Sequence, residues 1–333
     1  NNIPKIKQIQ EKKMEIMKLL PAGQDYLWGG ERLKKEFGKT LPLTPLAETW
    51  ECSVHPDGLS RIGNGKFQGK TLADVLKEHP EYMGSKMEAE SELPILVKFI
   101  DAKQDLSVQV HPDDDYARKH EYQNGKTEMW YIVDAEDDAS LIYGFAHPVT
   151  KEILNRAIET ETLGKHLQKV NVKKGDVYYV PAGTVHGIGK GTLVAEIQES
   201  SNVTYRVYDY DRKDKNGKKR ELHFDKAVEV MDMHVAEDVH QKPRLVHYYP
   251  GCSREILCRC QYFETERIRM RTEISFTVMD ASFQVLLCLD GKGRISDERE
   301  SFLTFQKGDC LFLPAGIGRC ELQGEAELLK VRC

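Results

Sequence analysis

The pattern of hydrophobic and polar positions changes near Leu93. Before that residue, Ile and Met recur at helical spacing over residues 3–20 with lysines opposite, which predicts an amphipathic N-terminal helix. Two short helices are expected over residues 70–79 and 80–90. After Leu93, short apolar runs between Asp-, Gly- and Asn-rich turns predict strands, and the first four cover residues 94–102, 105–111, 128–134 and 139–145.

Strand-like runs continue to the end of the chain, interrupted by helices expected over residues 150–169 and 224–233. The segment HQKPRL, with one proline, has the composition of a linker and precedes a last series of strands. We therefore expect three parts, which are an N-terminal helix over 1–20, a larger domain over 21–240 and a C-terminal domain over 241–333.

The pattern KGD-x4-PAG occurs twice, over residues 173–183 and 306–316, with six identities at fixed spacing. Each copy predicts a turn, an apolar strand and a second turn, because Gly supplies a positive φ and Pro fixes the turn. This arrangement is typical of a jelly-roll strand that enters the mouth of a pocket. The repeat predicts a mainly β fold of two tandem jelly-roll barrels, the first enlarged by helical insertions.

The two copies differ where chemistry is expected. After PAG the first copy continues with Thr-Val-His, which ends at His186, and the second with Ile-Gly-Arg, which ends at Arg319. Aligning WYIVDA with VLLCLDG places Gln284 opposite Glu128. Only the first barrel therefore carries candidate metal ligands.

Polar residues share one face of the expected strand DLSVQVH, where Ser107, Gln109 and His111 alternate with apolar positions. Side chains that point into a small barrel converge on one cavity, and Glu128 and His186 are placed to join them. Two imidazoles, a carboxylate and an amide oxygen suit a divalent first-row metal, above all Zn²⁺ with an open position for water. Each residue alone could instead be an ordinary exposed or hydrogen-bonded polar group.

The composition narrows the class of protein. With 48 Lys and Arg against 53 Asp and Glu, the net charge of -5 argues against a nucleic-acid-binding protein. No apolar run approaches the roughly 20 residues of a membrane span, and no signal peptide is recognised. The eight cysteines form no CxxC pair, which favours reduced thiols. We expect a cytoplasmic protein.

Four segments, QVHPDDDYA, GKTEMWYI, PAGTVHGI and EIQESSNVTYRVYDYDR, occur in the order found in type I phosphomannose isomerases of the cupin superfamily. The chain resembles the short bacterial form with two cupin domains, from about residue 27 through the second barrel. The resemblance implies one Zn²⁺ per chain and the interconversion of mannose 6-phosphate and fructose 6-phosphate through a cis-enediol. It further implies a small hexose 6-phosphate as partner, neither nucleic acid nor membrane, and a monomer or homodimer.

The resemblance also assigns roles to individual residues. It implies metal ligation by Gln109, His111, Glu128 and His186, catalysis by Arg206, Glu196 and Lys126, and phosphate or substrate contacts by Ser107, Lys98 and Arg212. A guanidinium stabilises a developing enediolate rather than acting as a base, so Glu196 and Lys126 stay alternatives for proton transfer.

The sequence is also compatible with two other functions, a metal cupin dioxygenase and a non-catalytic sensor of sugar phosphates. Basic residues near the site disfavour the apolar pocket of a dioxygenase. Arg206 and Glu196 together favour catalysis over sensing. Less specific explanations exist for single residues, because Lys98 could simply extend along its strand and Arg206 could pair with an aspartate of YDYD.

Overall fold

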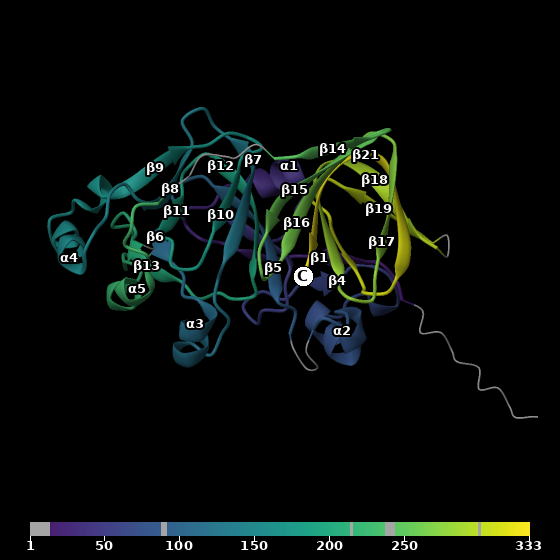
Figure 1. Ribbon diagram of the computed structural model, residues 1–333, viewed down its shortest axis with the longest axis horizontal. Helices are drawn as coiled ribbons and strands as arrows, with labels where there is room; N and C mark the ends of the chain where they lie inside the picture. Colours follow the sequence, from purple (N-terminus) through teal and green to yellow (C-terminus); the bar gives the residue numbers. More distant parts are fainter. Residues whose placement is uncertain (1–13, 88–91, 214–215, 237–243, 299–300) are drawn as a thin grey trace, which may run out of the picture.

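A computed structural model describes residues 14–87, 92–213, 216–236, 244–298 and 301–333. Figure 1 shows two β structures side by side, with α4 and α5 at the outer end of the first, α3 below the first and α2 below the second. All pairings between named strands are antiparallel, which confirms the mainly β prediction. Within the described residues, no helix is both long enough and apolar enough to cross a membrane.

The first barrel consists of two facing sheets. One sheet has the order β10-β7-β12-β5-β3-β2 and the other the order β13-β6-β11-β8-β9. Their strands are β2 Ala22–Gln24, β3 Glu48–Cys52, β5 Ile95–Ala102, β6 Val108–Val110, β7 Glu128–Ala135, β8 Ser140–Phe145, β9 Leu167–Asn171, β10 Val177–Val180, β11 His186–Ile188, β12 Thr192–Glu199 and β13 Tyr205–Tyr208.

The second barrel is one sheet in the order β14-β15-β16-β21-β18-β20-β1-β4, with β17 paired to β21 and β19 to β18. Its strands are β1 Met17–Leu20, β4 Arg61–Ile62, β14 Val246–Tyr249, β15 Cys252–Arg259, β16 Glu264–Met270, β17 Glu273–Val278, β18 Gln284–Asp297, β19 Phe302–Gln306, β20 Cys310–Leu313 and β21 Gly318–Arg332.

The predicted N-terminal helix over 3–20 is wrong at its C-terminal end. Residues 17–20 form strand β1, which pairs with β20 so that Met17 lies opposite Phe312. Met17 and Leu19 are buried in the core between the barrels, so the apolar spacing in this segment serves a strand. The rest of the predicted helix lies mainly in residues 1–13, which are outside the described residues.

The helices agree in part with the expectations. Thr71 caps α2 and Thr150 caps α4, each through a side-chain oxygen that accepts a backbone N–H. The helix expected over 150–169 was too long, because α4 ends at Glu159 and β9 begins at Leu167. In the described part of residues 80–90 only a single 3₁₀ turn forms. The helices are α1 Arg32–Phe37, α2 Leu72–Glu78, α3 Asp114–His120, α4 Lys151–Glu159 and α5 Phe224–Val230, with 3₁₀ turns at Gly65–Phe67, Pro80–Tyr82 and Leu163–Lys165.

The two KGD turns are built alike. The Gly175 and Gly308 residues both have φ of 91°, a region that disfavours residues with a Cβ. Gly175 donates its N–H to the Ile132 carbonyl and Gly308 donates to the Cys288 carbonyl, at 2.8 Å in each case. The repeated sequence therefore forms the same turn in both barrels, hydrogen-bonded to equivalent residues of β7 and β18.

This pairing fixes the alignment of the barrels. Glu128 lies opposite Val180 in the first barrel, and Gln284 lies opposite Leu313 in the second, in each case at the residue before PAG. The match places Gln284 at the position of Glu128, as the sequence alignment predicted.

An apolar core joins the barrels. The outward face of the six-stranded sheet contributes Val97 and Met129, which belong to the same core as Leu287, Phe312 and Leu329 of the second barrel. Because β5 and β12 are buried on both faces, polar side chains on their inward faces lie away from water. Such groups require ion pairs or hydrogen bonds, and this is where the candidate site lies.

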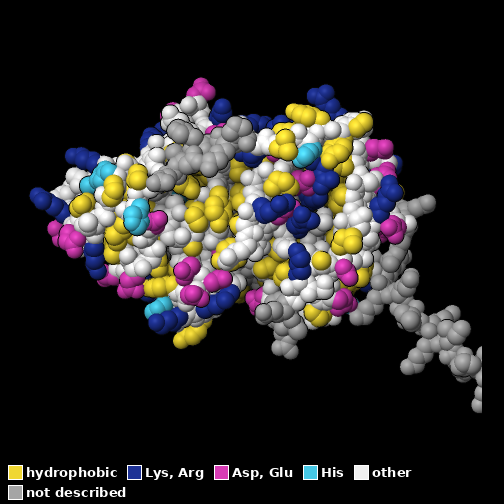
Figure 2. Space-filling model, viewed as in Figure 1, with side chains coloured by type: hydrophobic (Ala, Val, Ile, Leu, Met, Phe, Trp, Pro, Cys, Tyr) yellow, Lys and Arg dark blue, Asp and Glu magenta, His cyan; other side chains and the backbone are white. Residues whose placement is uncertain are grey.

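The face of the molecule shown in Figure 2 carries both signs of charge. In Figure 2, Lys and Arg side chains lie among Asp and Glu side chains on both barrels. This view agrees with the small net charge of -5.

Candidate metal centre

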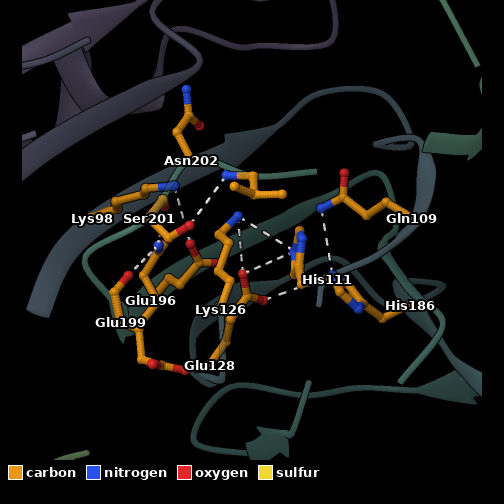
Figure 3. A network of polar contacts seen from close by, with 12 residues as sticks. Lys98, Gln109, His111, Lys126, Glu128, His186, Glu196, Glu199, Ser201 and Asn202 are labelled. Carbon is orange, nitrogen blue, oxygen red and sulfur yellow. Dashed lines mark hydrogen bonds and ion pairs between the residues drawn. The ribbon is translucent and has the colours of Figure 1, made fainter. Parts of the chain in front are cut away.

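Strand pairing brings the predicted metal ligands together. His186 on β11 lies directly opposite Gln109 on β6, and His111 follows Gln109 by two residues, which places it on the same face. Glu128 begins β7 in the facing sheet. Figure 3 shows the side chains of these four residues converging on one place, with Lys126 beside them.

The distances are those of a compact donor cluster. The His111 Nε2 lies 3.2 Å from Glu128 Oε1, and the His186 Nε2 lies 3.8 Å from Glu128 Oε2. One ligand atom from each of these residues lies within 4.8 Å of the others, and all three side chains are buried. The Gln109 amide reaches the same point, with its nitrogen 3.4 Å from His186 Nε2, and a turn of the amide would present its oxygen instead.

Both imidazoles are neutral at ordinary pH, which is the form that binds a metal cation. The His186 Nδ1 lies 2.8 Å from the Thr184 carbonyl and donates to it, which leaves the Nε2 lone pair facing the cluster. Burial lowers the pKa of His186, and burial together with the charge of Lys126 lowers the pKa of His111 to about 3. Neutral imidazole is the form that ligates metals.

Lys126 supplies positive charge to the cluster. Its Nζ lies 3.2 Å from Glu128 Oε1 and 3.4 Å from His111 Nε2. Although burial by itself raises the pKa of Glu128, Lys126 and the imidazoles hold that pKa well below its ordinary value. Glu128 is therefore a carboxylate, as a metal ligand must be.

A second cluster of charged side chains lies in the same barrel. Lys98 Nζ lies 3.3 Å from Glu196 Oε1 and 3.7 Å from Glu48 Oε2, and above the ring of Trp50 at 4.9 Å. Burial and the charge of Glu128 raise the pKa of Glu196 to about 7, against the opposing effect of Lys98. A buried carboxyl with a pKa near neutrality can both accept and return a proton.

Two of the remaining predicted residues lie beside the ligands. Ser107 is buried and its hydroxyl donates to Gln109 Oε1 at 3.3 Å. Arg206 on β13 lies opposite Gln109, which puts it in the same row of residues as His186. Its guanidinium donates to the Glu221 carbonyl at 2.8 Å, while its Nε is buried without a hydrogen-bond partner.

Arg212 is already engaged. Its guanidinium donates to the Asp105 carbonyl at 2.5 Å and pairs with Asp209, and Asp209 also binds Arg220. A phosphate contact of Arg212 stays a prediction.

Trp130 is a site residue that the sequence did not predict. This residue is buried, and its indole N–H lies between Glu128 and Glu196. The only sequence signal was its position two residues after Glu128, on the same face of the strand; a tryptophan in an apolar run otherwise predicts core packing.

Two family models match the chain. Residues 16–139 match "Phosphomannose isomerase type I, catalytic domain", and residues 254–333 match "Mannose-6-phosphate isomerase, cupin domain". The second match agrees with the predicted cupin-type fold.

Full-length relatives support the same relation. The mannose-6-phosphate isomerase ManA of Bacillus subtilis is 40% identical over 312 residues, which are 93% of this chain and 96% of the relative. The mannose-6-phosphate isomerase of Streptococcus mutans is 38% identical over 303 residues, covering 91% and 93%.

Solved structures share the fold. The mannose 6-phosphate isomerase of Bacillus subtilis superposes with a TM-score of 0.87 at 35% identity, over 96% of this chain and 99% of that one. A mannose 6-phosphate isomerase bound with zinc and yttrium gives a TM-score of 0.74 at 17% identity, with the same coverage. At that identity the likeness is one of fold alone.

Proposed function

The chain belongs to the type I mannose-6-phosphate isomerase family, and we propose that it interconverts mannose 6-phosphate and fructose 6-phosphate in the first barrel with one Zn²⁺ per chain. The family relation gives the enzyme class, and it favours the isomerase over both the dioxygenase and the sensor. The observation that carries the metal assignment is the buried cluster of His111, Glu128 and His186.

The donor set fits zinc. Two neutral imidazoles and a carboxylate are the ligands of catalytic zinc sites, and the amide of Gln109 can supply a further oxygen. Glu128 Oε1 faces His111 Nε2 at 3.2 Å and Glu128 Oε2 faces His186 Nε2 at 3.8 Å, so both oxygens lie beside an imidazole nitrogen. A zinc ion held by these residues would polarise the sugar oxygens at C1 and C2 as a Lewis acid.

We assign the proton transfer between C2 and C1 to Glu196. Its pKa of about 7 matches the working pH of a general base, and it accepts the C2 proton and returns it to C1 through a cis-enediol. Lys126, with its ammonium against Glu128 and His111, is better placed to stabilise negative charge on the enediolate than to act as the base.

Three cationic side chains and one hydroxyl supply the remaining contacts in this assignment. Arg206 stays positively charged and lies in the row of Gln109 and His186, so it stabilises the enediolate. Lys98 and Ser107 line the same interior and are assigned to the substrate, with Ser107 as a hydroxyl donor. Arg212 is assigned to the phosphate, and binding it requires that the guanidinium leave Asp209.

A coupled assay of mannose 6-phosphate turnover, with the metal content measured in the same samples, tests the proposal. Treatment with a chelator should remove one zinc per chain and abolish turnover, and added Zn²⁺ should restore it. Arg206→Ala should keep zinc and lose about 100-fold in kcat, the scale of one preorganised charge. Full turnover by the metal-free chain would contradict the mechanism.

We also propose a cytoplasmic location and leave the monomer and homodimer as alternatives for light scattering to separate. All eight cysteines are free thiols in the structure, which is the usual state in a reducing compartment. A free thiol count of eight in freshly purified protein, by thiol titration, is expected.

A further inference from the structure

Trp130 lies between the two carboxylates to which the proposed function gives different roles. It is on β7, on the same face as Glu128, and directly opposite Glu196 on β12. Its side chain is 1% exposed. Its indole N–H contacts the carboxylates of Glu128 and Glu196 directly.

The indole N–H is shared by the two carboxylates. Trp130 Nε1 lies 3.1 Å from Glu128 Oε2 and 2.9 Å from Glu196 Oε2. Two buried carboxylates repel each other, and a common donor between them offsets that repulsion. The N–H is the only polar group of an indole, so the rest of the ring adds no competing contact.

The shared indole N–H determines which oxygen of each carboxylate is left to contact other groups. With Oε2 of Glu128 bound to the indole, Oε1 faces His111 Nε2 at 3.2 Å. With Oε2 of Glu196 bound, Oε1 faces Lys98 at 3.3 Å. One donor thus orients both carboxylates at once.

The ring of Trp130 also contacts a predicted metal ligand. Its centroid lies 5.3 Å from that of His186, with an angle of 73° between the planes. This edge-to-face contact restricts the His186 ring, whose Nδ1 is already fixed by the Thr184 carbonyl. Trp130 therefore contacts two of the four predicted ligands.

We propose that Trp130 is a positioning residue that holds the metal-ligating carboxylate of Glu128 and the proton-transferring carboxylate of Glu196 in fixed relative orientation. This inference rests on the roles given to both residues in the proposed function. It assigns Trp130 no contact with substrate.

Trp130→Phe removes the N–H and keeps an aromatic ring. Partners of metal ligands typically contribute 10- to 100-fold to metal affinity or activity, so we expect kcat to fall roughly 10- to 100-fold. KM should change less than about 3-fold, because ground-state binding of the sugar does not involve the indole. Zinc affinity, measured by competition with a chromogenic chelator, should fall about 10-fold.

Trp28→Phe is the matched control. Trp28 is buried in the same apolar core and stacks on Tyr26, and its ring makes none of the carboxylate contacts of Trp130. It should lose comparable thermal stability while kcat and zinc affinity stay at the wild-type level. If Trp130→Phe matches Trp28→Phe in both kcat and zinc affinity, the inference is wrong.

Two further measurements separate positioning from packing. Replacing Trp130 with benzothienylalanine keeps the shape and packing of the indole and exchanges only the N–H for sulfur, so it should reproduce the kcat and zinc losses of Trp130→Phe. In a Glu196→Gln background, Trp130→Phe should lower kcat less than in the wild type; an equal factor in both backgrounds would contradict action through Glu196.

The zinc measurement keeps the inference separate from the proposed function. If the wild-type chain fails to turn over mannose 6-phosphate, the proposed function fails, but chelator competition still compares Trp130 and Trp28 variants. Unchanged zinc affinity in the benzothienylalanine variant would overturn the role of the indole toward Glu128, whatever the activity.

Discussion

The two barrels carry a buried ion pair at the same point, with the charges exchanged. In the first, Lys98 on β5 lies opposite Glu196 on β12, with Nζ and Oε1 3.3 Å apart. In the second, Glu266 on β16 lies opposite Lys330 on β21 at 2.8 Å. The repeat alignment makes β5 equivalent to β16 and β12 equivalent to β21, so acid and base have changed places.

The neighbours of these pairs differ more than the pairs themselves. Trp130 lies opposite Glu196, whereas Leu286 lies opposite Lys330. Leucine offers no donor. Gln284 stands at the position of Glu128, and its Oε1 is buried without a hydrogen-bond partner. Among the described residues, the first barrel alone gathers a His and Glu donor cluster.

The environment of the acid decides whether the pair is reactive or structural. Glu266 is bound by both Arg254 and Lys330, and although burial opposes it, these two cations lower its pKa. Glu196 shares Lys98 with Glu48, and burial raises its pKa to about 7. The same barrel thus supports a proton-transfer site in one copy and a plain ion pair in the other, which illustrates that fold alone does not set function.

The largest difference between the barrels should appear when the aligned residues Glu128 and Gln284 are changed. Glu128→Gln should lose zinc and about 1000-fold in kcat, because Lewis-acid stabilisation contributes several kcal/mol and each 1.36 kcal/mol is tenfold. Gln284→Ala should leave zinc content and kcat unchanged. Measured zinc per chain and turnover decide this, and a loss of zinc in Gln284→Ala would show that the barrels are not functionally distinct.

A smaller difference is expected when each lysine is replaced by methionine. Lys98→Met leaves two buried carboxylates, Glu48 and Glu196, without their cation and should destabilise the fold by roughly 3–5 kcal/mol. Lys330→Met leaves Glu266 paired with Arg254 and should cost about 1 kcal/mol.

Urea unfolding of both lysine variants at neutral pH measures these costs. Lys330→Met should also retain full turnover, which makes it the control for any activity loss in Lys98→Met. Equal destabilisation would mean that Arg254 does not compensate in the second barrel.

Buried carboxyls of the two barrels should give opposite pH dependence of stability. Burial and the charge of Asp114 raise the pKa of Glu199 to about 8. The native state therefore binds this proton more tightly than the unfolded chain, and stability declines as pH rises from the ordinary glutamate pKa through about 8. The lowered pKa of Glu266 acts the other way, since its contribution is present at higher pH and declines as the carboxylate is protonated.

Glu199→Gln and Glu266→Gln test these opposite signs. Relative to wild type, Glu199→Gln should gain stability between pH 5 and pH 8, by up to about 4 kcal/mol because one pKa unit is 1.36 kcal/mol. Glu266→Gln should show its largest deficit at neutral pH and a shrinking deficit towards pH 3. Unfolding midpoints measured across this range supply the comparison, and parallel curves for both variants would contradict it.

Much of the fold and the donor cluster could be predicted because they depend on short-range patterns. The alternation of Gln109 and His111 fixes their shared face, and the KGD turns fix where β10 and β20 lie. Strand β1 could not be predicted, since Met17 pairs with Phe312 across the whole chain, and four residues with apolar spacing suit a helix equally well.

The role of Trp130 could not be predicted for a different reason. Its polar atom is one N–H on a large apolar ring, so the sequence pattern favours packing. Only the register between β7 and β12, which places it opposite Glu196, reveals the hydrogen bonds. Likewise the family resemblance implied a phosphate contact for Arg212, while its pairing with Asp209 depends on the local turn.

The smallest expected contrast concerns the repeated turn. Gly175 and Gly308 share φ of 91°, so alanine at either position should cost about 1–2 kcal/mol of backbone strain. At Gly308 an added Cβ would also lie 2.6 Å from the carbonyl oxygen of Phe37, which is the last residue of α1. At Gly175 the atom nearest to an added Cβ is Arg267 Nη1, at 3.9 Å. Gly308→Ala should therefore lower the unfolding midpoint more than Gly175→Ala. Equal shifts in the thermal unfolding midpoint would show that α1 moves to accommodate the added Cβ at Gly308. The contact with α1 would then place no additional constraint on the second turn.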